Sequence, residues 1–202
     1  MKKFGLLLLP ILAITLLLGV NAFADDTYQV TYYSNANTTG APDGSLRITN
    51  TGATVASGVS QNLYAAIYVF DDSEELQECC SCVVTPDGLL SESVDKQLTA
   101  NTVTGAKPTR GIIKVIGTTS SNPASITGIA HGLAGWMTQI QGSQVNLTTS
   151  KWSGPFSTTQ SPLTPSDLSA AELEVLTSTC GFASILGSGR GTCSCTPEDE
   201  DF

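Results

Sequence analysis

The stretch L-Y-A-A-I-Y-V-F-D-D-S-E-E-L-Q-E-C-C-S-C-V-V, from Leu63 to Val84, decides the fold. Its first eight residues, 63–70, are apolar throughout, which is typical of a strand buried on both faces. The acidic residues 71–75 interrupt the apolar run, and a mixed segment follows over 76–84. The pattern predicts a β-hairpin with an acidic tip, and its first strand is expected in the middle of a sheet.

Further short segments on both sides of this hairpin have the composition of strands. They are rich in β-branched and aromatic residues, and Pro-Asp-Gly turns occur at 42–44 and 86–88. Many short strands separated by turns predict a mainly β fold, an antiparallel β-sandwich, of which the immunoglobulin-like arrangement is one form. The additional expected strands are 27–33, 46–49, 90–94, 110–116, 133–140 and 145–149.

Only the C-terminal region has a helical period. Leu173, Leu176 and Cys180 are spaced i, i+3, i+7, which places them on one face of a helix. We therefore expect one α-helix over about 167–186, packed on the sandwich. An earlier end at Gly181 is the alternative.

Ser169 and Glu172 form the pattern of a capping box at the start of this helix. In such a box the Ser hydroxyl accepts a hydrogen bond from a free backbone amide, and the Glu side chain reaches back to the Ser amide. The pattern predicts both interactions.

The N-terminal residues 1–24 have the pattern of a cleaved signal peptide. K-K at 2–3 precedes an apolar core at 6–18, and A-F-A at 22–24 is a small-x-small cleavage motif. Cleavage would leave 178 residues, with 7 basic and 18 acidic side chains and a net charge of −11. We expect a single sandwich domain over 25–195 and an acidic, disordered tail over 196–202.

This charge and the hydropathy exclude several classes of partner. A strongly acidic chain whose few Lys and Arg residues are scattered does not favour nucleic acid or anionic membrane surfaces. No segment after the signal sequence is apolar for long enough to span a bilayer, so no membrane span is expected after cleavage. The expected location is secreted or periplasmic.

Six cysteines in two clusters are the most specific feature of the sequence. In an exported chain an even number of cysteines predicts disulfides. Bridges within a cluster are strained, so pairing each residue of one cluster with one of the other leaves six arrangements, among which the sequence does not choose. Neighbouring cysteines of a strand point to opposite faces, which favours at least one bridge around an edge. The clusters are Cys79, Cys80 and Cys82, and Cys180, Cys193 and Cys195.

The separation of the clusters makes such bridges valuable for stability. Cys82 and Cys180 are 98 residues apart, and a first bridge across a loop of that length stabilises by about 4–5 kcal/mol. A metal or iron–sulfur site and a redox-active pair are the alternatives, because thiolates are soft ligands. The repeated C-x-x-C pairs of zinc knuckles are absent from the sequence, so we expect disulfides and neither a metal nor another cofactor.

Other candidate residues have weaker support. His131 is the only histidine, and without a G-x-S-x-G motif a structural role is favoured over a catalytic one. The acidic residues 71–75 resemble a calcium loop or a glycosidase carboxylate pair, but they lack the EF-hand pattern, which favours a solvated hairpin tip. The Gly-rich stretch 187–191 lacks the Lys-Ser/Thr ending of a phosphate loop, so a flexible link to Cys193 is favoured.

Surface chemistry offers two more hypotheses. Asn37-Thr38-Thr39 and Asn146-Leu147-Thr148 match glycosylation acceptors, but the signal sequence is of bacterial type, which favours chance matches. Exposed aromatic residues are typical of sugar-binding surfaces, although core packing is the default for each of them. The aromatic residues considered are Trp136, Trp152, Tyr32 and Tyr33.

Several of these segments together resemble a family of uncharacterised secreted bacterial proteins. The similarity lies in I-Y-V-F-D-D (67–72), E-C-C-S-C (78–82), L-T-A-N-T-V-T (98–104) and the C-G-F…C-S-C segment (180–195). The resemblance implies a shared fold and a shared cysteine framework over roughly 44–195. It implies no activity and no catalytic residues.

These observations favour a secreted, disulfide-stabilised binding or structural module with a protein or carbohydrate ligand. The sequence has few titratable groups and a Ser/Thr-rich surface, which suits contact more than catalysis. The alternatives are a secreted hydrolase that uses Asp or Glu, and a cysteine-based metal or redox protein.

Overall fold

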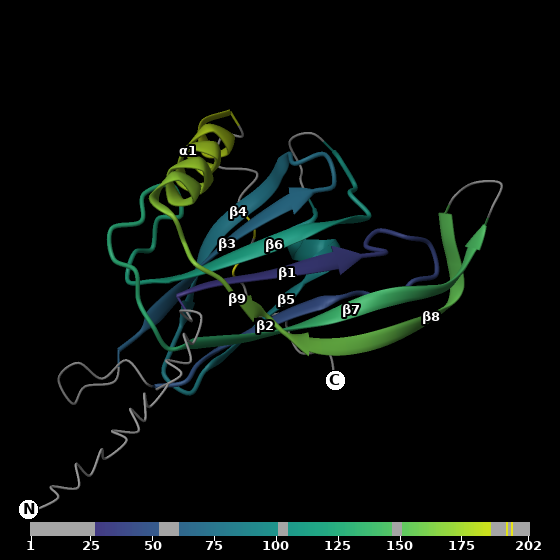
Figure 1. Ribbon diagram of the computed structural model, residues 1–202, viewed down its shortest axis with the longest axis horizontal. Helices are drawn as coiled ribbons and strands as arrows, with labels where there is room; N and C mark the ends of the chain where they lie inside the picture. The colour runs from purple at the N-terminus through teal and green to yellow at the C-terminus, as the bar shows by residue number, and fades with distance from the viewer. Residues whose placement is uncertain are drawn as a thin grey trace, which may run out of the picture.

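The computed structural model describes residues 27–52, 61–100, 105–146 and 151–186, together with Cys193 and Cys195. Two antiparallel sheets face each other, and one α-helix lies on the outer face of the larger sheet (Figure 1). The predicted mainly β fold with a C-terminal helix is confirmed. The predicted signal peptide, the Gly-rich stretch 187–191 and the tail at 196–202 lie outside the described residues.

The larger sheet has five strands in the order β4–β3–β6–β1–β9. β3 lies between β4 and β6, and its residues from Ala65 to Phe70 are all buried, which confirms the predicted central strand. β3 pairs with β4 from Leu63 opposite Val84 onward, so the predicted hairpin is also confirmed. The strands are β1 (Tyr28–Ser34), β3 (Leu63–Asp71), β4 (Leu76–Val84), β6 (Arg110–Thr118) and β9 (Thr164–Pro165).

The smaller sheet has four strands in the order β5–β2–β7–β8, and its β7–β8 hairpin projects beyond the other strands (Figure 1). The first two strands of the chain lie in different sheets, whereas they are neighbours in the constant-type immunoglobulin order. The five-residue π-helix η1 (Val94–Leu98) follows β5. The strands are β5 (Leu89–Ser93), β2 (Ser45–Asn50), β7 (Leu133–Asn146) and β8 (Lys151–Pro162).

The core lies between the two sheets. Strand alternation directs Ile67 and Ile113 from the larger sheet toward Ile48, Leu133 and Met137 from the smaller one. All five side chains are almost completely buried. Burial of each contributes about 1.5–3 kcal/mol, so this interface supplies most of the hydrophobic stabilisation.

The helix α1 (Ala170–Leu186) packs on the outer face of the larger sheet. Its predicted stripe is confirmed, because Leu176 and Cys180 are fully buried and Leu173 packs beside them. The helix continues past Gly181, so the earlier end is wrong. Within the described part of the chain, no helix has the length and apolarity needed to cross a membrane.

The start of α1 corrects one half of the capping-box prediction. The Glu172 amide donates to the Ser169 Oγ at 3.0 Å, as predicted. The Glu172 carboxylate instead accepts hydrogen bonds from Tyr28 and Lys114 on the sheet. A local sequence pattern could not reveal this, because both partners are distant in the chain.

Candidate functional site

The outer face of the larger sheet is only partly covered by α1. The helix packs over the part of the sheet that contains Tyr28, Tyr68 and Ile116. The rest of this face forms an open groove of about 670 Å³ between α1 and the tip of the β3–β4 hairpin. We call it the outer groove. Its lining residues are Tyr32, Tyr33, Ser34, Phe70, Asp71, Asp72, Glu74, Arg110, Gly111, Ile112, Lys114 and Val175.

The outer groove has an apolar and aromatic lining from two neighbouring strands and the helix. Tyr32 on β1 is 46% exposed and Ile112 on β6 is 37% exposed, although both lie within a regular sheet. The exposed Val175 of α1 adds an apolar wall. The Tyr32 hydroxyl accepts a hydrogen bond from the Gln141 Nε2 at 3.2 Å, which orients the ring.

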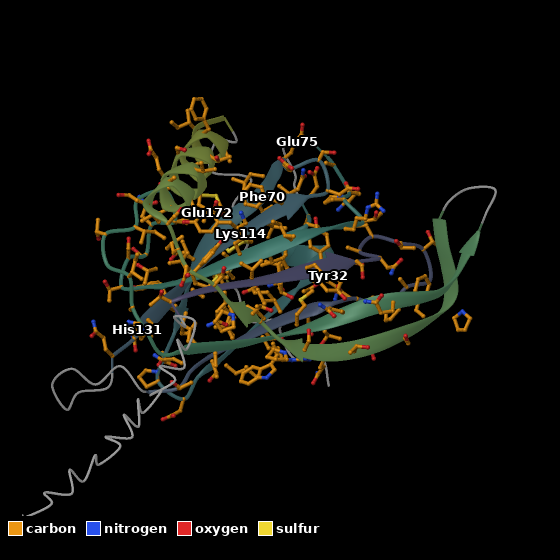
Figure 2. All side chains as sticks on the ribbon, in the orientation of Figure 1. Tyr32, Phe70, Glu75, Lys114, His131 and Glu172 are labelled. Atoms are coloured by element: carbon orange, nitrogen blue, oxygen red, sulfur yellow. A yellow bond between two sulfur atoms is a disulfide. The ribbon has the colours of Figure 1, made fainter. Side chains whose placement is uncertain are left out.

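A charged group lies where the groove meets the helix. The Lys114 Nζ is 2.5 Å from the Glu172 Oε1 and 5.1 Å from the centre of the Phe70 ring. Figure 2 shows these three side chains close together beneath α1, with Tyr32 farther along the sheet. The Tyr28 hydroxyl donates to the same Glu172 oxygen at 3.2 Å. Lys114 is therefore held by an anion and an aromatic face at once.

The environment of Tyr28 keeps its hydroxyl protonated. Burial, followed by the adjacent Glu172 carboxylate, raises the pKa of Tyr28 well above its usual value. A protonated hydroxyl donates to Glu172, while an ionised one would repel it. The Tyr28–Glu172–Lys114 cluster thus links the first turn of α1 to β1 and β6 beside the groove.

The acidic hairpin tip forms the opposite wall of the groove. The Asp71 Oδ1 accepts from the amides of Ser73 and Glu75, at 2.8 and 3.0 Å, and its Oδ2 accepts from the Gln77 side chain at 2.8 Å. Asp72 forms an exposed ion pair with Arg110, with 2.6 Å between Oδ2 and Nε. The Asp71 carboxylate thus closes the turn and the Asp72 carboxylate links the tip to β6, which favours the solvated tip over a calcium loop.

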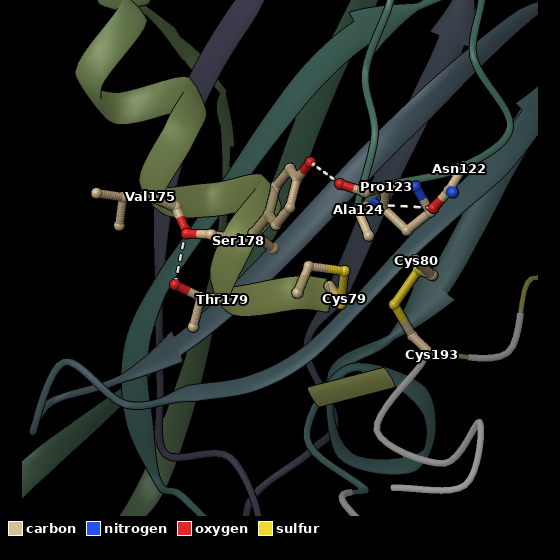
Figure 3. The surroundings of a disulfide bond; sticks show 11 residues. Cys79, Cys80, Asn122, Pro123, Ala124, Val175, Ser178, Thr179 and Cys193 are labelled. Atoms are coloured by element: carbon tan, nitrogen blue, oxygen red, sulfur yellow. Dashed lines mark hydrogen bonds between the residues drawn. A yellow bond between two sulfur atoms is a disulfide. The ribbon is translucent and has the colours of Figure 1, made fainter. Parts of the chain in front are cut away.

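The six predicted cysteines form three disulfides between the two clusters. Cys79 pairs with Cys180 of α1 on the outer face of β4, and Figure 3 shows this cysteine beside the helix. Cys80 and Cys82 face the sandwich core and pair with Cys193 and Cys195. The bridges therefore attach both faces of β4 to the C-terminal part of the chain.

The sulfur atoms of the two inner disulfides lie close together. The Sγ atoms of Cys80 and Cys82 are 3.6 Å apart, and those of Cys80, Cys82 and Cys195 all lie within 4.8 Å of one another. A soft metal ion binds thiolates, whereas the Cys80 sulfur is bonded to that of Cys193 and the Cys82 sulfur to that of Cys195. In this oxidised form the cluster is a covalent clamp.

β4 also carries a buried carboxyl group. Glu78 is 4% exposed, and burial raises its pKa to about 7, although Lys107 and the Ala100 amide act in the opposite direction. It lies on the same strand as the three cysteines and outside the residues that line the outer groove.

The other predicted candidates lie elsewhere. His131 is exposed in the loop before β7, and Figure 2 shows it far from Glu75 of the hairpin tip. Trp136 is 42% exposed on the smaller sheet, whereas Tyr33, although buried in the core, is the one of these residues that also borders the outer groove. The side chain of Trp152 and part of the second glycosylation motif are outside the described residues.

Sequence reasoning missed most of the groove. Of its lining residues it proposed Tyr32 and Tyr33 for sugar contact and the acidic tip for calcium, but not Ile112, Lys114 or Arg110. The available signal was the alternation of 110–116, which places Ile112 and Lys114 on one face of a strand. That the helix covers only part of this face depends on tertiary packing.

No protein-family model, curated protein or solved structure matches the chain. The geometry of the outer groove therefore carries the functional inference.

Proposed function

We propose that this protein is an exported binding module whose outer groove binds a neutral oligosaccharide. The observation that carries the proposal is the pairing of exposed aromatic and apolar side chains, Tyr32 and Ile112, with fixed polar groups in one open groove. Binding sites combine an apolar lining with a few well-placed polar groups. Oligosaccharides present complementary surfaces, with apolar C–H faces and hydroxyl edges.

The charges in the groove favour a neutral ligand. Lys114 is paired with Glu172, and Arg110 is paired with Asp72. Paired groups offer donors and acceptors in fixed positions, and the other two charged residues of the lining, Asp71 and Glu74, are acidic, so the groove does not attract an anion. Because the Glu172 and Asp72 carboxylates already have partners, the groove is better suited to holding hydroxyl groups than to hydrolysing a glycosidic bond.

Export is the second part of the proposal. It rests on the signal-peptide pattern and on three disulfides, which persist in oxidising compartments. The resemblance to secreted bacterial proteins agrees with this location and adds no ligand.

The test uses two exposed aromatic residues on opposite sheets. Tyr32→Ala removes the aromatic contact of the groove, and Trp136→Ala is the matched control, since the two side chains are 46% and 42% exposed. The probes are neutral gluco-oligosaccharides, N-acetylglucosamine oligomers and manno-oligosaccharides, with uronic acid oligomers as the charged comparison. We expect binding of at least one neutral probe, and a loss of about tenfold or more in Tyr32→Ala only.

Two results would overturn this proposal. One is that no neutral probe binds the unmodified protein at millimolar concentration. The other is that Tyr32→Ala and Trp136→Ala weaken binding equally, which would place the ligand outside the outer groove.

A further inference from the structure

β8 presents a long edge that is uncovered in the described part of the chain. It is the last strand of the smaller sheet, and no described strand pairs with its outer side. Its residues from Pro155 to Pro162 are exposed or half-buried on both faces. The backbone groups along such an edge can pair with another strand.

The hydrogen-bond register shows which backbone groups point outward. The Leu163 amide donates to the Gly135 carbonyl at 2.9 Å, so these two opposite residues form a hydrogen-bonded pair. In an antiparallel ladder such pairs alternate with non-bonded pairs. The amides and carbonyls of Phe156, Thr158 and Gln160 therefore point away from β7.

Both ends of this outward-facing stretch are closed. Pro162 occupies the next outward position and has no amide hydrogen to donate. On the other side the β7–β8 register shifts between Gly142 and Gln144, opposite Ser153 and Phe156. The free edge is thus a short regular window centred on Thr158.

This window lies in a stretch of the chain that is almost free of charge. The chain has a net charge of −9, yet Lys151 is the only charged residue between Lys114 and Asp167. Two acidic copies repel each other over most of their surfaces, and least where acidic side chains are absent. Exposed edges are commonly guarded by charged residues, and 154–162 contains none.

We infer that the protein forms a dimer in which the β8 edges of two copies pair antiparallel across a twofold axis at Thr158. In this register Thr158 faces Thr158 of the second copy, and Phe156 faces Gln160 of the second copy. An edge of this kind is complementary to itself, as a twofold interface requires. The sheets of the two copies would become continuous, independently of any ligand in the outer groove.

The test is analytical ultracentrifugation of the full exported chain over a concentration series to about 1 mM, because a small interface binds weakly. Thr158→Pro removes one outward amide without removing a β7–β8 hydrogen bond, and Thr158→Val keeps the amide. We expect dimer formation by the unmodified protein and by Thr158→Val, and a dimer at least tenfold weaker for Thr158→Pro. Added salt should strengthen the dimer by screening repulsion.

Hydrogen exchange on the unmodified protein gives a second readout that needs no variant. The amides of Phe156, Thr158 and Gln160 should become protected as concentration rises, while the neighbouring inward amides change little. A chain that stays monomeric throughout the series overturns the inference, and so does a dimer that leaves these three amides unprotected. If the protein stays monomeric but its β8 edge binds a strand of a different protein, the proposed pairing with a second copy is also wrong.

Discussion

The molecule has two long edge strands, β4 and β8, which are treated in opposite ways. β4 is nine residues long and mostly buried, and all three of its cysteines are bridged to the C-terminal part of the chain. β8 is twelve residues long, and its residues 155–162 are exposed or half-buried, with no helix or disulfide of the described residues over them. An edge position does not by itself determine exposure, because what the rest of the chain places over the edge decides it.

The contrast predicts that substitutions on β4 affect the stability of the fold and that substitutions on the outer side of β8 affect self-association. Changes along β4 remove covalent links, buried groups or packed side chains, so they should lower the free energy of unfolding. Changes along the outer side of β8 remove groups that contact solvent, so they should alter self-association and leave unfolding almost unchanged.

Reduction of all three disulfides should have the largest effect. The Cys80–Cys193 bridge alone closes a separation of 113 residues, worth about 5 kcal/mol. The other two bridges span 101 and 113 residues, but once the first bridge exists they close only short rings through it, worth about 2–3 kcal/mol each. The combined loss, on the order of 10 kcal/mol, is comparable with the whole stability of a typical domain. We expect reduced and alkylated protein to lose its cooperative thermal transition in circular dichroism. Retention of that transition near its original midpoint would show that β4 is held without its bridges.

Titration of Glu78 should have the next largest effect. Its folded pKa of about 7 lies above the ordinary value of 4.5, so the folded state binds the proton more tightly than the unfolded chain does. This stabilisation is fully present below pH 4.5 and is lost as the pH rises through 7, by up to about 3 kcal/mol.

Urea unfolding at a series of pH values measures this loss. Glu78→Gln should flatten the decline between pH 4.5 and 7 and should be more stable than the unmodified protein at pH 8. Glu75→Gln, at the exposed hairpin tip, is the control and should leave the decline in place. An unchanged slope in Glu78→Gln would assign the pH dependence to another group.

The smallest effects compare one serine on each edge. The Ser81 Oγ on β4 donates to the Ser120 carbonyl at 3.0 Å, whereas Ser157 on β8 is exposed. Ser81→Ala should lower the free energy of unfolding by about 1 kcal/mol, and Ser157→Ala should change it by less than about 0.5 kcal/mol. Equal changes in the free energy of unfolding for the two variants, measured by chemical denaturation, would show that the β4 and β8 edges do not differ in their contribution to stability.

The β3–β4 hairpin and the helix that covers it were largely predictable from the sequence, whereas β8 was not. The apolar run at 63–70 and the helical stripe through Leu176 follow from local periodicity, so the hairpin and α1 could be expected from the sequence. β8 lacks a strand pattern, since it is polar and contains Pro155 and Pro162. Its pairing with β7 over most of its length makes it a strand.

The candidate site shows the same limit. The sequence restricted the disulfides to six arrangements, but the order in which Cys79, Cys80 and Cys82 pair depends on which face of β4 each one occupies. The outer groove exists because α1 packs on only part of the outer face of the larger sheet. Neither property is local, because both are set by contacts between residues far apart in the chain.

The three bridges also determine how the molecule carries mechanical load. When the chain is pulled from the β1 side and from Cys195, the shortest covalent path passes from β4 directly across the bridges to the C-terminal cysteines. Residues 83–179 lie outside that path and bear no tension while the bridges are intact. β6, β7 and β8 therefore lie in a loop closed by the disulfides and are not stretched between the two pulled points. While the bridges are intact, the chain before Cys79 is the part that lengthens under force.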